Sequence, residues 1–441
     1  MKTKLLNLWE AVRTSFWFIP GLLVFAAIGL ALAIVTIDQQ VDLEPNRAFG
    51  LLYTGGPEGA RAILSTIAGS MITVAGVAFS ITIVALTLAS SQFGPRLLRN
   101  FMRDTGNQMV LGIFIATFIY CLLVLRSVLT VGEHVFVPSL SVTFAMALAL
   151  VNVGVLIYFI HHVSTSIQAD HVIAAVYREL SENLQRLFPE ELGTGSAEGD
   201  RDGPRPEEVS DAHAHRSTAS ESGYLQAIDS DGLLDLACKS DSLFHLQYRP
   251  GEFIVAGSTL VTVECKEPLD ESLAEQIADS FISGPQRTPE QDAEFAIHQL
   301  VEVAARALSP GINGPFTAIT CIDRLGSALC FLAKRAFPSR YCYDEEGELR
   351  MIARPITFTG ITNAAFDQIR QYGRSSVAVT IRLLEALTMI AAHTRTQEQR
   401  QAILRQAEMI ARASKDALPE ENDRQDVEER YKALRSEIHT R

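Results

Sequence analysis

The sequence predicts an α-helical multi-pass membrane protein with four transmembrane helices and a mixed α+β C-terminal domain. The first observation is that residues 63–91 contain no charged residue. At roughly 1.5 Å per residue they would form a helix about 43 Å long, which exceeds the roughly 30 Å hydrocarbon core of a bilayer. The second is the uneven charge. Residues 1–164 carry nine Lys/Arg and seven Asp/Glu, a net charge of +2, whereas residues 165–441 carry 29 and 44, a net charge of −15. This acidic part argues against a nucleic-acid partner.

Four apolar segments are long enough to cross a membrane, and they cover residues 16–37, 63–91, 110–131 and 138–160. The connection after the first segment is acidic. Basic residues instead precede the first segment and follow the second, where they include Arg96, Arg99 and Arg103. Because cytoplasmic loops are enriched in Lys and Arg, this distribution places both termini in the cytoplasm.

The composition changes repeatedly after the fourth segment, which predicts five parts in all. We expect a transmembrane domain over 1–164, a connecting amphipathic helix over 165–188, a flexible linker over 189–222, a small β-rich subdomain over 223–265 and a mainly helical domain over 266–441. Pro, Gly, Ser and charged residues mark the linker, and short alternating runs mark the β subdomain. A hairpin is expected where residues 341–343 and 349–352 flank Asp344-Glu345-Glu346-Gly347.

Small and hydroxyl residues form a stripe along the second apolar segment. They recur at steps of 3, 4 or 7 and therefore share one face of a helix: Ser65, Gly69, Thr73, Gly76, Ser80, Thr87 and Ser91. This face is typical of a pore lining, because rings of Ser and Thr can replace part of an ion's hydration shell. It is equally typical of close helix–helix packing, in which Ser and Thr bond across the interface.

A basic stretch follows the stripe. Gly94-Pro95 is expected to break the helix at the inner membrane boundary, and Arg96, Arg99 and Arg103 recur beyond it at helical spacing. At the mouth of a pore these residues would form a cationic vestibule that concentrates anions. The other interpretation is a positive-inside anchor on lipid phosphates.

Further polar residues lie within the apolar segments. Arg126 is late in the third segment, where it could line a water path, pair with Glu133 or extend to the headgroups. Asn152 is expected to bond to another helix at mid-membrane. His161 and His162 directly follow the fourth segment and could sense pH or anchor the helix at the interface.

The C-terminal half offers only weak candidates for chemistry. Ser309, Asn313 and Asp323 could form an enzyme site, but a tight turn between two helices explains the same residues, with Pro315 at the first helical position. Glu294, His298 and Glu302 share a helix face, where they could hold a cation or be solvated. His213 and His215 lie in the expected linker, where they could bind a metal or be solvated. The chain has no GxSxG, P-loop, GxGxxG or HExxH motif. We expect no catalytic residue, no metal and no cofactor.

Several long runs resemble a known family. They include ARAILSTIAGSMITVAGVAFSITIVALTLASSQFGPRLLRNFMRD, LGIFIATFIYCLLVLR and RALSPGINGPFTAITCIDRL. They are similar to bacterial predicted membrane proteins grouped as domain of unknown function 2254, over nearly the whole chain. The resemblance implies a multi-pass inner-membrane protein with a cytoplasmic C-terminal region, and implies no established activity. The family motif reads SPxxNDPFTA, whereas this chain has Gly314 in place of Asp.

These observations favour an oligomeric ion channel of the bacterial inner membrane. The second apolar helix would line the pore, and the cytoplasmic domain would assemble or gate it. Its partners would be other copies of the same chain, membrane lipid and inorganic ions, and not nucleic acid. The alternative is a non-conducting membrane-tethered scaffold or sensor, in which the stripe only packs helices.

Overall fold

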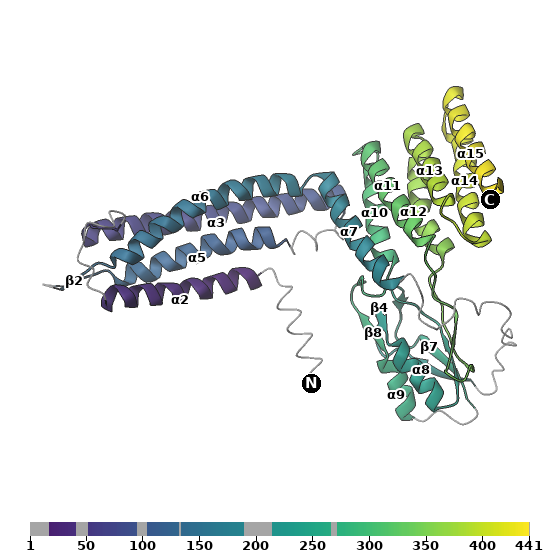
Figure 1. The fold of residues 1–441 in the computed structure, drawn as a ribbon, viewed down its shortest axis with the longest axis horizontal. Coiled ribbons are helices and arrows are strands. Elements are labelled where there is room, and N and C mark those ends of the chain that lie inside the picture. Colours follow the sequence, from purple (N-terminus) through teal and green to yellow (C-terminus); the bar gives the residue numbers. More distant parts are fainter. Residues whose placement is uncertain are drawn as a thin grey trace. The chain divides into compact units, whose positions relative to one another are not determined.

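The computed structural model describes residues 17–40, 52–94, 104–131, 134–188, 214–265 and 271–440. The chain divides into two compact units, Met1–His171 and Val172–Arg441. Long helices make up the first unit, and sheets and shorter helices make up the second (Figure 1).

Four long helices form the first unit, as the apolar segments predict. They are α2 (Phe18–Gln40), α3 (Pro57–Phe93), α5 (Thr105–Ser127) and α6 (Ser139–Ser166). α5 contacts each of the other three helices. Half of its most apolar 18-residue window is buried, against 11–22% in α2, α3 and α6. The other three helices therefore surround α5 and leave most of their own apolar surface outside the unit, as lipid-exposed helices do.

The ends of two helices differ from the predicted segments. α3 begins at Pro57, six residues before the predicted start, because Pro is well suited to the first turn of a helix. The third segment was expected to be helical to residue 131, but α5 ends at Ser127. β1 (Leu129–Val131) and β2 (His134–Phe136) then pair antiparallel and connect α5 to α6.

The count of candidate membrane helices also differs from the prediction. Among the described residues, five helices are long and apolar enough to cross a bilayer, rather than four. The fifth is α11 (Pro315–Leu332), which belongs to the second unit. It packs mainly against α10 (Glu294–Ala307) and α13 (Val377–Ala391), which accounts for its apolar composition within the mainly helical part of the chain.

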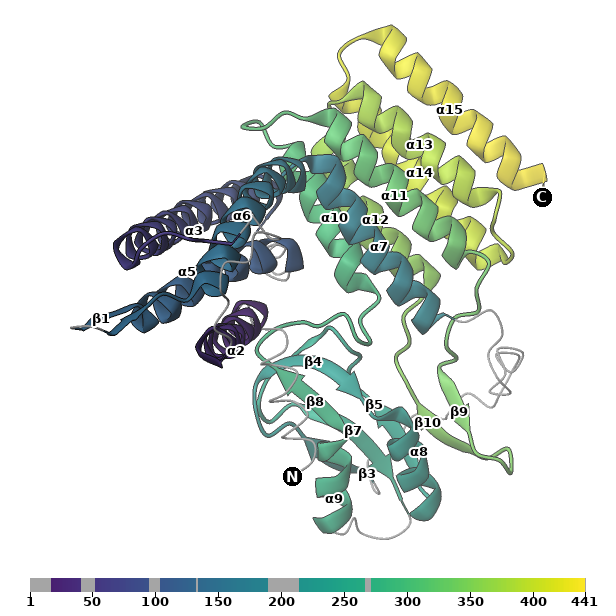
Figure 2. The ribbon, with the colours of Figure 1, turned by 60° about the vertical axis from the view of Figure 1, so that its left-hand side comes forward.

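The second unit contains two small sheets and a layer of helices (Figure 2). A five-stranded sheet has the order β3-β7-β5-β10-β9, and a three-stranded sheet has the order β6-β4-β8. The strands are β3 (Ala214–Thr218), β4 (Gly223–Ile228), β5 (Leu243–Leu246), β6 (Phe253–Ile254), β7 (Thr259–Glu264), β8 (Phe281–Gly284), β9 (Tyr341–Tyr343) and β10 (Leu349–Ile352). Two short helices accompany them, α8 (Ser230–Lys239) and α9 (Glu271–Asp279).

The sheets are larger than residues 223–265 alone would make them. β3 lies within the expected linker 189–222, where it pairs antiparallel with β7. β8 follows α9 and pairs with β4. The hairpin of β9 and β10 was predicted and is confirmed, but β10 also pairs parallel with β5, more than a hundred residues earlier. Sequence patterns within a few residues do not predict a pairing between strands so far apart in the chain. Residues 189–213 of the expected linker, including His213, lie outside the described residues.

The helical layer contains α7 (Ala169–Leu187), α10, α11, α12 (Phe358–Gly373), α13, α14 (Gln397–Ala417) and α15 (Glu421–Thr440). The hairpin leaves this layer after α11, joins the five-stranded sheet and returns to the layer at α12 (Figure 2). The sheets have a core of their own around Leu225, Phe244 and Val261.

Candidate functional site

The stripe of small and hydroxyl residues lies on the exposed side of α3. All seven residues, Ser65, Gly69, Thr73, Gly76, Ser80, Thr87 and Ser91, are exposed in the single chain. At about 100° per residue they fall within an arc of about 80°. The buried residues of α3 lie roughly opposite: Ala60, Leu64, Ala68, Ala75, Ala78, Ala89 and Phe93. The stripe therefore faces away from the helices of its own chain.

The glycines of the stripe do not serve packing within the chain. A Cβ atom built on Gly69 or Gly76 would have no atom within 4 Å outside its own turn of helix. Ala68 and Ala75 are buried instead, in the clusters that α3 forms with its neighbours. The close-packing interpretation therefore holds for the alanines within one chain, and for the glycines only if another chain covers them.

The hydroxyl groups of the stripe are bonded to their own helix. Ser65, Thr73, Ser80, Thr87 and Ser91 each donate to a backbone carbonyl three or four residues earlier, over 2.7–3.1 Å. This use of the donor makes a hydroxyl tolerable in a membrane. The oxygen retains lone pairs on the exposed side, so the stripe presents acceptors.

α3 ends where Gly94-Pro95 predicts. The helix stops at Phe93, and Gly94 caps it with a φ of 112° while its N–H donates to the carbonyl of Ser90. Positive φ favours Gly over any residue with a side chain. The predicted mouth residues Arg96, Arg99 and Arg103 lie outside the described residues.

The two other intramembrane candidates have different surroundings. Arg126 is exposed in the last turn of α5, which ends one residue later. Glu133, its expected partner, lies outside the described residues. Asn152 is buried, as expected of a residue that bonds across helices. Its Nδ2 donates to Oγ1 of Thr117 on α5 over 2.9 Å and to the carbonyl of Leu148 over 2.7 Å.

Two aspartates connect the membrane helices at their ends, and sequence reasoning missed both. Asp38, near the end of α2, accepts from the backbone N–H of Leu140 and Ser141 and from the Ser141 hydroxyl, over 2.6–3.0 Å. It thereby caps the first turn of α6 from another helix. A carboxylate in a short connection after an apolar segment is the only sequence signal for this role.

Asp104 acts at the opposite ends of these helices. It caps α5 by accepting from the N–H of Gly106, and its Oδ2 lies 2.7 Å from Nε2 of His162 on α6. Tyr158 stacks on the His162 ring with centroids 5.4 Å apart. His162 thus has a specific partner within the first unit, whereas His161 is exposed.

The SPGING run forms the expected turn between two helices. Ser309 donates to the carbonyl of Arg306, Asn313 adopts a φ of 48°, and Pro315 begins α11. Asp323 lies further along α11 and accepts from Arg382 of α13. The three residues proposed as an enzyme site are therefore used by a turn and by an interhelical ion pair.

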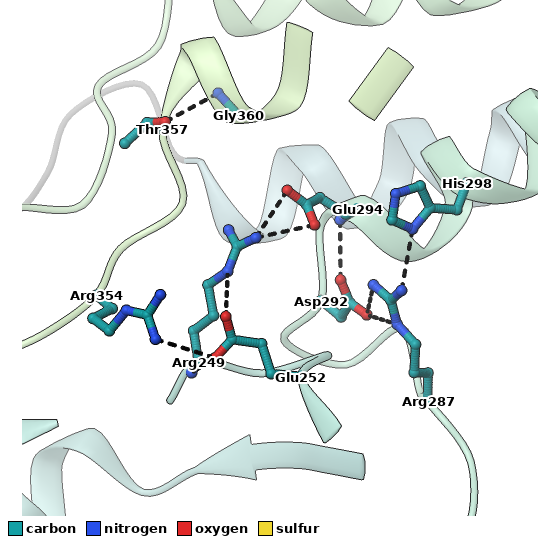
Figure 3. A network of polar contacts seen from close by, with 9 residues as sticks. All are labelled: Arg249, Glu252, Arg287, Asp292, Glu294, His298, Arg354, Thr357 and Gly360. Carbon is teal, nitrogen blue, oxygen red and sulfur yellow. Dashed lines mark hydrogen bonds and ion pairs between the residues drawn. The ribbon is translucent and has the colours of Figure 1, made fainter. Parts of the chain in front are cut away.

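Arginine side chains contact the three residues Glu294, His298 and Glu302 on α10, and Figure 3 shows two of these contacts. Arg249 donates to both carboxylate oxygens of Glu294 over 3.1 and 3.2 Å. Arg287 donates to Nδ1 of His298 over 3.1 Å, and Glu302 pairs with Arg306. Among the described residues, no group of three His, Cys, Asp or Glu side chains could hold a metal ion.

Arg287 also binds a buried carboxylate. Its Nη2 and Nε lie 2.6 and 2.7 Å from Oδ2 of Asp292, which is 4% exposed. Burial raises the pKa of Asp292, while the charge and hydrogen bonds of Arg287 act in the opposite direction. This pair lies within the segment between β8 and α10, whereas the contact of Arg249 with Glu294 joins the turn at residues 249–252 to α10.

Comparisons with known proteins find a matching family model and similar mycobacterial proteins. The model of a family described as "Predicted membrane protein (DUF2254)" matches residues 13–389. Uncharacterized proteins from Mycobacterium bovis and Mycobacterium tuberculosis strain H37Rv are each 33% identical to this chain over 436 residues, covering 96% of it and 81% of the relative. No solved structure matches the chain significantly.

Proposed function

The chain belongs to the DUF2254 family of predicted membrane proteins, and from that premise we propose that it is one subunit of a homo-oligomeric ion channel in the bacterial inner membrane. The exposed stripe of α3 carries the proposal. Within a single chain the stripe covers nothing, and a face of glycine and hydroxyl groups gains little from acyl chains. Sister copies around a symmetry axis would turn the stripe toward a shared aqueous path.

The residues beside the stripe support this orientation. Ile72, Phe79 and Ile83 are exposed on one side of it, and Val77, Val84 and Leu88 are exposed on the other. In a ring of α3 helices these apolar flanks would contact neighbouring subunits and lipid, while the narrow polar arc faced the axis. The length of α3, 37 residues or about 55 Å, would carry the path across the bilayer and beyond it.

The chemistry of such a path follows from the hydroxyl oxygens. Their acceptors would replace part of the water around a passing ion without holding it tightly. Arg96, Arg99 and Arg103 follow α3 directly in sequence, and in the topology with both termini in the cytoplasm they would enrich anions at the inner mouth. The second unit would then be cytoplasmic and would assemble or gate the channel.

Ion flux through purified protein tests the proposal. Full-length protein in liposomes should conduct, and Ser80→Leu or Thr87→Leu should reduce the conductance severalfold by replacing a hydroxyl with an apolar side chain. Ile81→Leu, at an exposed position outside the stripe, is the matched control and should conduct as the parent does.

Two results would contradict the channel. One is the absence of conductance under steps of voltage, pH and membrane tension. The other is conductance that Ser80→Leu and Thr87→Leu leave unchanged. An assembled but non-conducting oligomer would favour the alternative function, a membrane-tethered scaffold or sensor whose stripe packs subunits together.

A further inference from the structure

A large cavity lies within the second unit, where the sheets meet the helical layer. Its volume is about 740 Å³, which is within the usual range for small-molecule sites. Segments that connect the two parts form much of its lining: the end of α7 at Phe188, residues 291–294 before and at the start of α10, Pro338 and Ser339 before β9, and residues 353–356 between β10 and α12. Ligand sites occur preferentially at such junctions.

Aromatic and apolar side chains form one wall of this seam cavity. Tyr248, Tyr341 and Tyr343 line it together with Leu246 and Met351. Tyr343 is exposed, and Tyr248 and Tyr341 are partly exposed. Flat π surfaces next to aliphatic groups suit a planar aromatic molecule, which can stack on the rings.

The two arginines of the lining differ in how closely a carboxylate approaches them. Each acid in the lining has its own arginine: Asp292 pairs with Arg287, Glu294 with Arg249 and Asp344 with Arg350. Arg354 is different. One of its nitrogens donates to the carbonyl of Gln247 over 2.6 Å and lies 3.7 Å from Glu252.

Arg354 is therefore suited to bind an anion. Its side chain is 56% exposed, and in Figure 3 a single dashed line, to Glu252, joins it to the network around Arg249. A guanidinium has five N–H donors in a planar fork that matches carboxylate and phosphate oxygens. Glu252 is already shared with Arg249, so an incoming anion would not have to displace a close ion pair.

We propose that the seam cavity binds a small molecule of mononucleotide size, which combines a planar aromatic body with one anionic group. The aromatic body lies among Tyr248, Tyr341 and Tyr343, and Arg354 binds the anion. The ligand contacts strands of the five-stranded sheet and the segment that leads into α12, so its binding joins the two parts of the unit. This site does not depend on ion conduction, and its test does not measure flux.

Calorimetry on the full-length protein in detergent tests both halves of the recognition. The probes are AMP, which has an aromatic body and an anion, adenosine, which lacks the anion, and ribose 5-phosphate, which lacks the aromatic body. AMP should bind more tightly than either fragment. Arg354→Met should weaken AMP binding by at least about tenfold, because a charge-assisted hydrogen bond is lost, and should leave adenosine binding unchanged.

Arg374→Met is the matched control. Arg374 is an exposed arginine at the opposite end of α12 from the cavity, and its replacement should not change AMP binding. Equal weakening by Arg374→Met would indicate a general charge effect and would contradict a site at Arg354.

A native thiol locates the binding. Cys342 lines the cavity, whereas Cys238 is exposed and lies outside it. Burial raises the pKa of Cys342, so alkylation with N-ethylmaleimide at mildly alkaline pH, mapped by mass spectrometry, is the suitable reaction. AMP should slow modification of Cys342 severalfold and leave Cys238 unaffected. The proposal is overturned if AMP does not bind, or if it binds without protecting Cys342.

Discussion

At the scale of single residues, a few polar side chains determine how the membrane helices meet. Asp38 satisfies two backbone N–H groups of α6, and Asn152 bonds to Thr117 of α5. Within the hydrocarbon region of a bilayer, no water is available to bond polar groups, so their hydrogen-bond partners must come from the protein.

Asp38→Ala should destabilise the first unit by about 1–3 kcal/mol, because the first turn of α6 then keeps unsatisfied N–H groups. Asp38→Asn retains one acceptor oxygen and should cost less. Denaturant unfolding of the full chain in detergent measures both changes. Gln39→Ala, at an exposed neighbouring position, is the control. If Gln39→Ala lowers the free energy of unfolding as much as Asp38→Ala does, the loss at Asp38 does not come from the cap.

Gly314→Asp should stabilise the second unit by about 0.5–1 kcal/mol. Gly314 precedes α11 without a side-chain cap, and an added Cβ would meet its nearest atoms at 3.7 Å, which is ordinary contact. An aspartate there can accept from the first turn and complement the helix dipole. Thermal unfolding should show a higher Tm.

Gly311→Asp is the control for this change, since it adds the same charge three residues away from the cap. If both substitutions shift the Tm equally, net charge rather than capping is responsible. This result would also remove the reason to regard the aspartate of the family motif as a helix cap.

At the scale of elements, two tight turns hold the sheets in position. Residues 249–252 form a turn in which Gly251 has a φ of 94° and packs on the Asp292 carboxylate. In the hairpin turn of β9 and β10, Asp344 accepts from the N–H groups of Glu346 and Glu348 and from Arg350. The first turn connects the sheets to α10. The second turn closes the hairpin of β9 and β10, which joins the five-stranded sheet through β5.

Gly251→Ala should destabilise the second unit more than Gly257→Ala does. Both residues have positive φ, 94° and 83°, so each substitution costs about 1–2 kcal/mol of backbone strain. Only at position 251 would the new Cβ lie 2.5 Å from Oδ2 of Asp292; at 257 it would meet nothing within 4 Å. Equal changes in the free energy of unfolding would show that the contact with Asp292 carries no energy.

The hairpin turn should make stability depend on pH in the acid range. The hydrogen bond from Arg350 lowers the pKa of Asp344 below its ordinary value. The ionised carboxylate therefore contributes stability above that ordinary value, and this contribution is lost as the pH falls through the lower, folded-state pKa.

Asp344→Asn should accordingly be less stable than the parent near neutral pH, with a difference that shrinks below about pH 4. Unfolding of both proteins across this range measures the difference. A constant gap down to the lowest pH at which the parent folds would mean that the charge of Asp344 does not stabilise the hairpin.

At the scale of the whole molecule, the proposed function depends on the orientation of α3. Its stripe is exposed, and its alanine face is buried against the other helices. A solitary chain would therefore leave a polar arc along an otherwise apolar helix. Assembly would cover that arc, and the two sides of α3 would then have different neighbours.

Cysteine cross-linking distinguishes these two sides. Ser80→Cys should form disulfide-linked dimers in membranes under mild oxidation, because the stripe faces other copies in the proposed assembly. Ile81→Cys, one residue further along and also exposed, lies about 100° away around the helix and should cross-link weakly. Efficient linking at position 81 in place of position 80 would contradict an inward-facing stripe.

The sequence alone determined the membrane helices, the bond of Asn152 to another helix, the end of α3 at Gly94 and the hairpin around Asp344. Each depends on apolar length, helical period or turn chemistry within a few residues. Only the tertiary structure placed β10 beside β5, joined Asp38 to α6 and Asp104 to His162, and formed the seam cavity. These contacts join residues far apart in the chain, and no local pattern specifies their partners. The stripe of α3 depends on both levels. The sequence spacing places its seven residues on one face of the helix. Packing of the other helices against the opposite face leaves the stripe exposed.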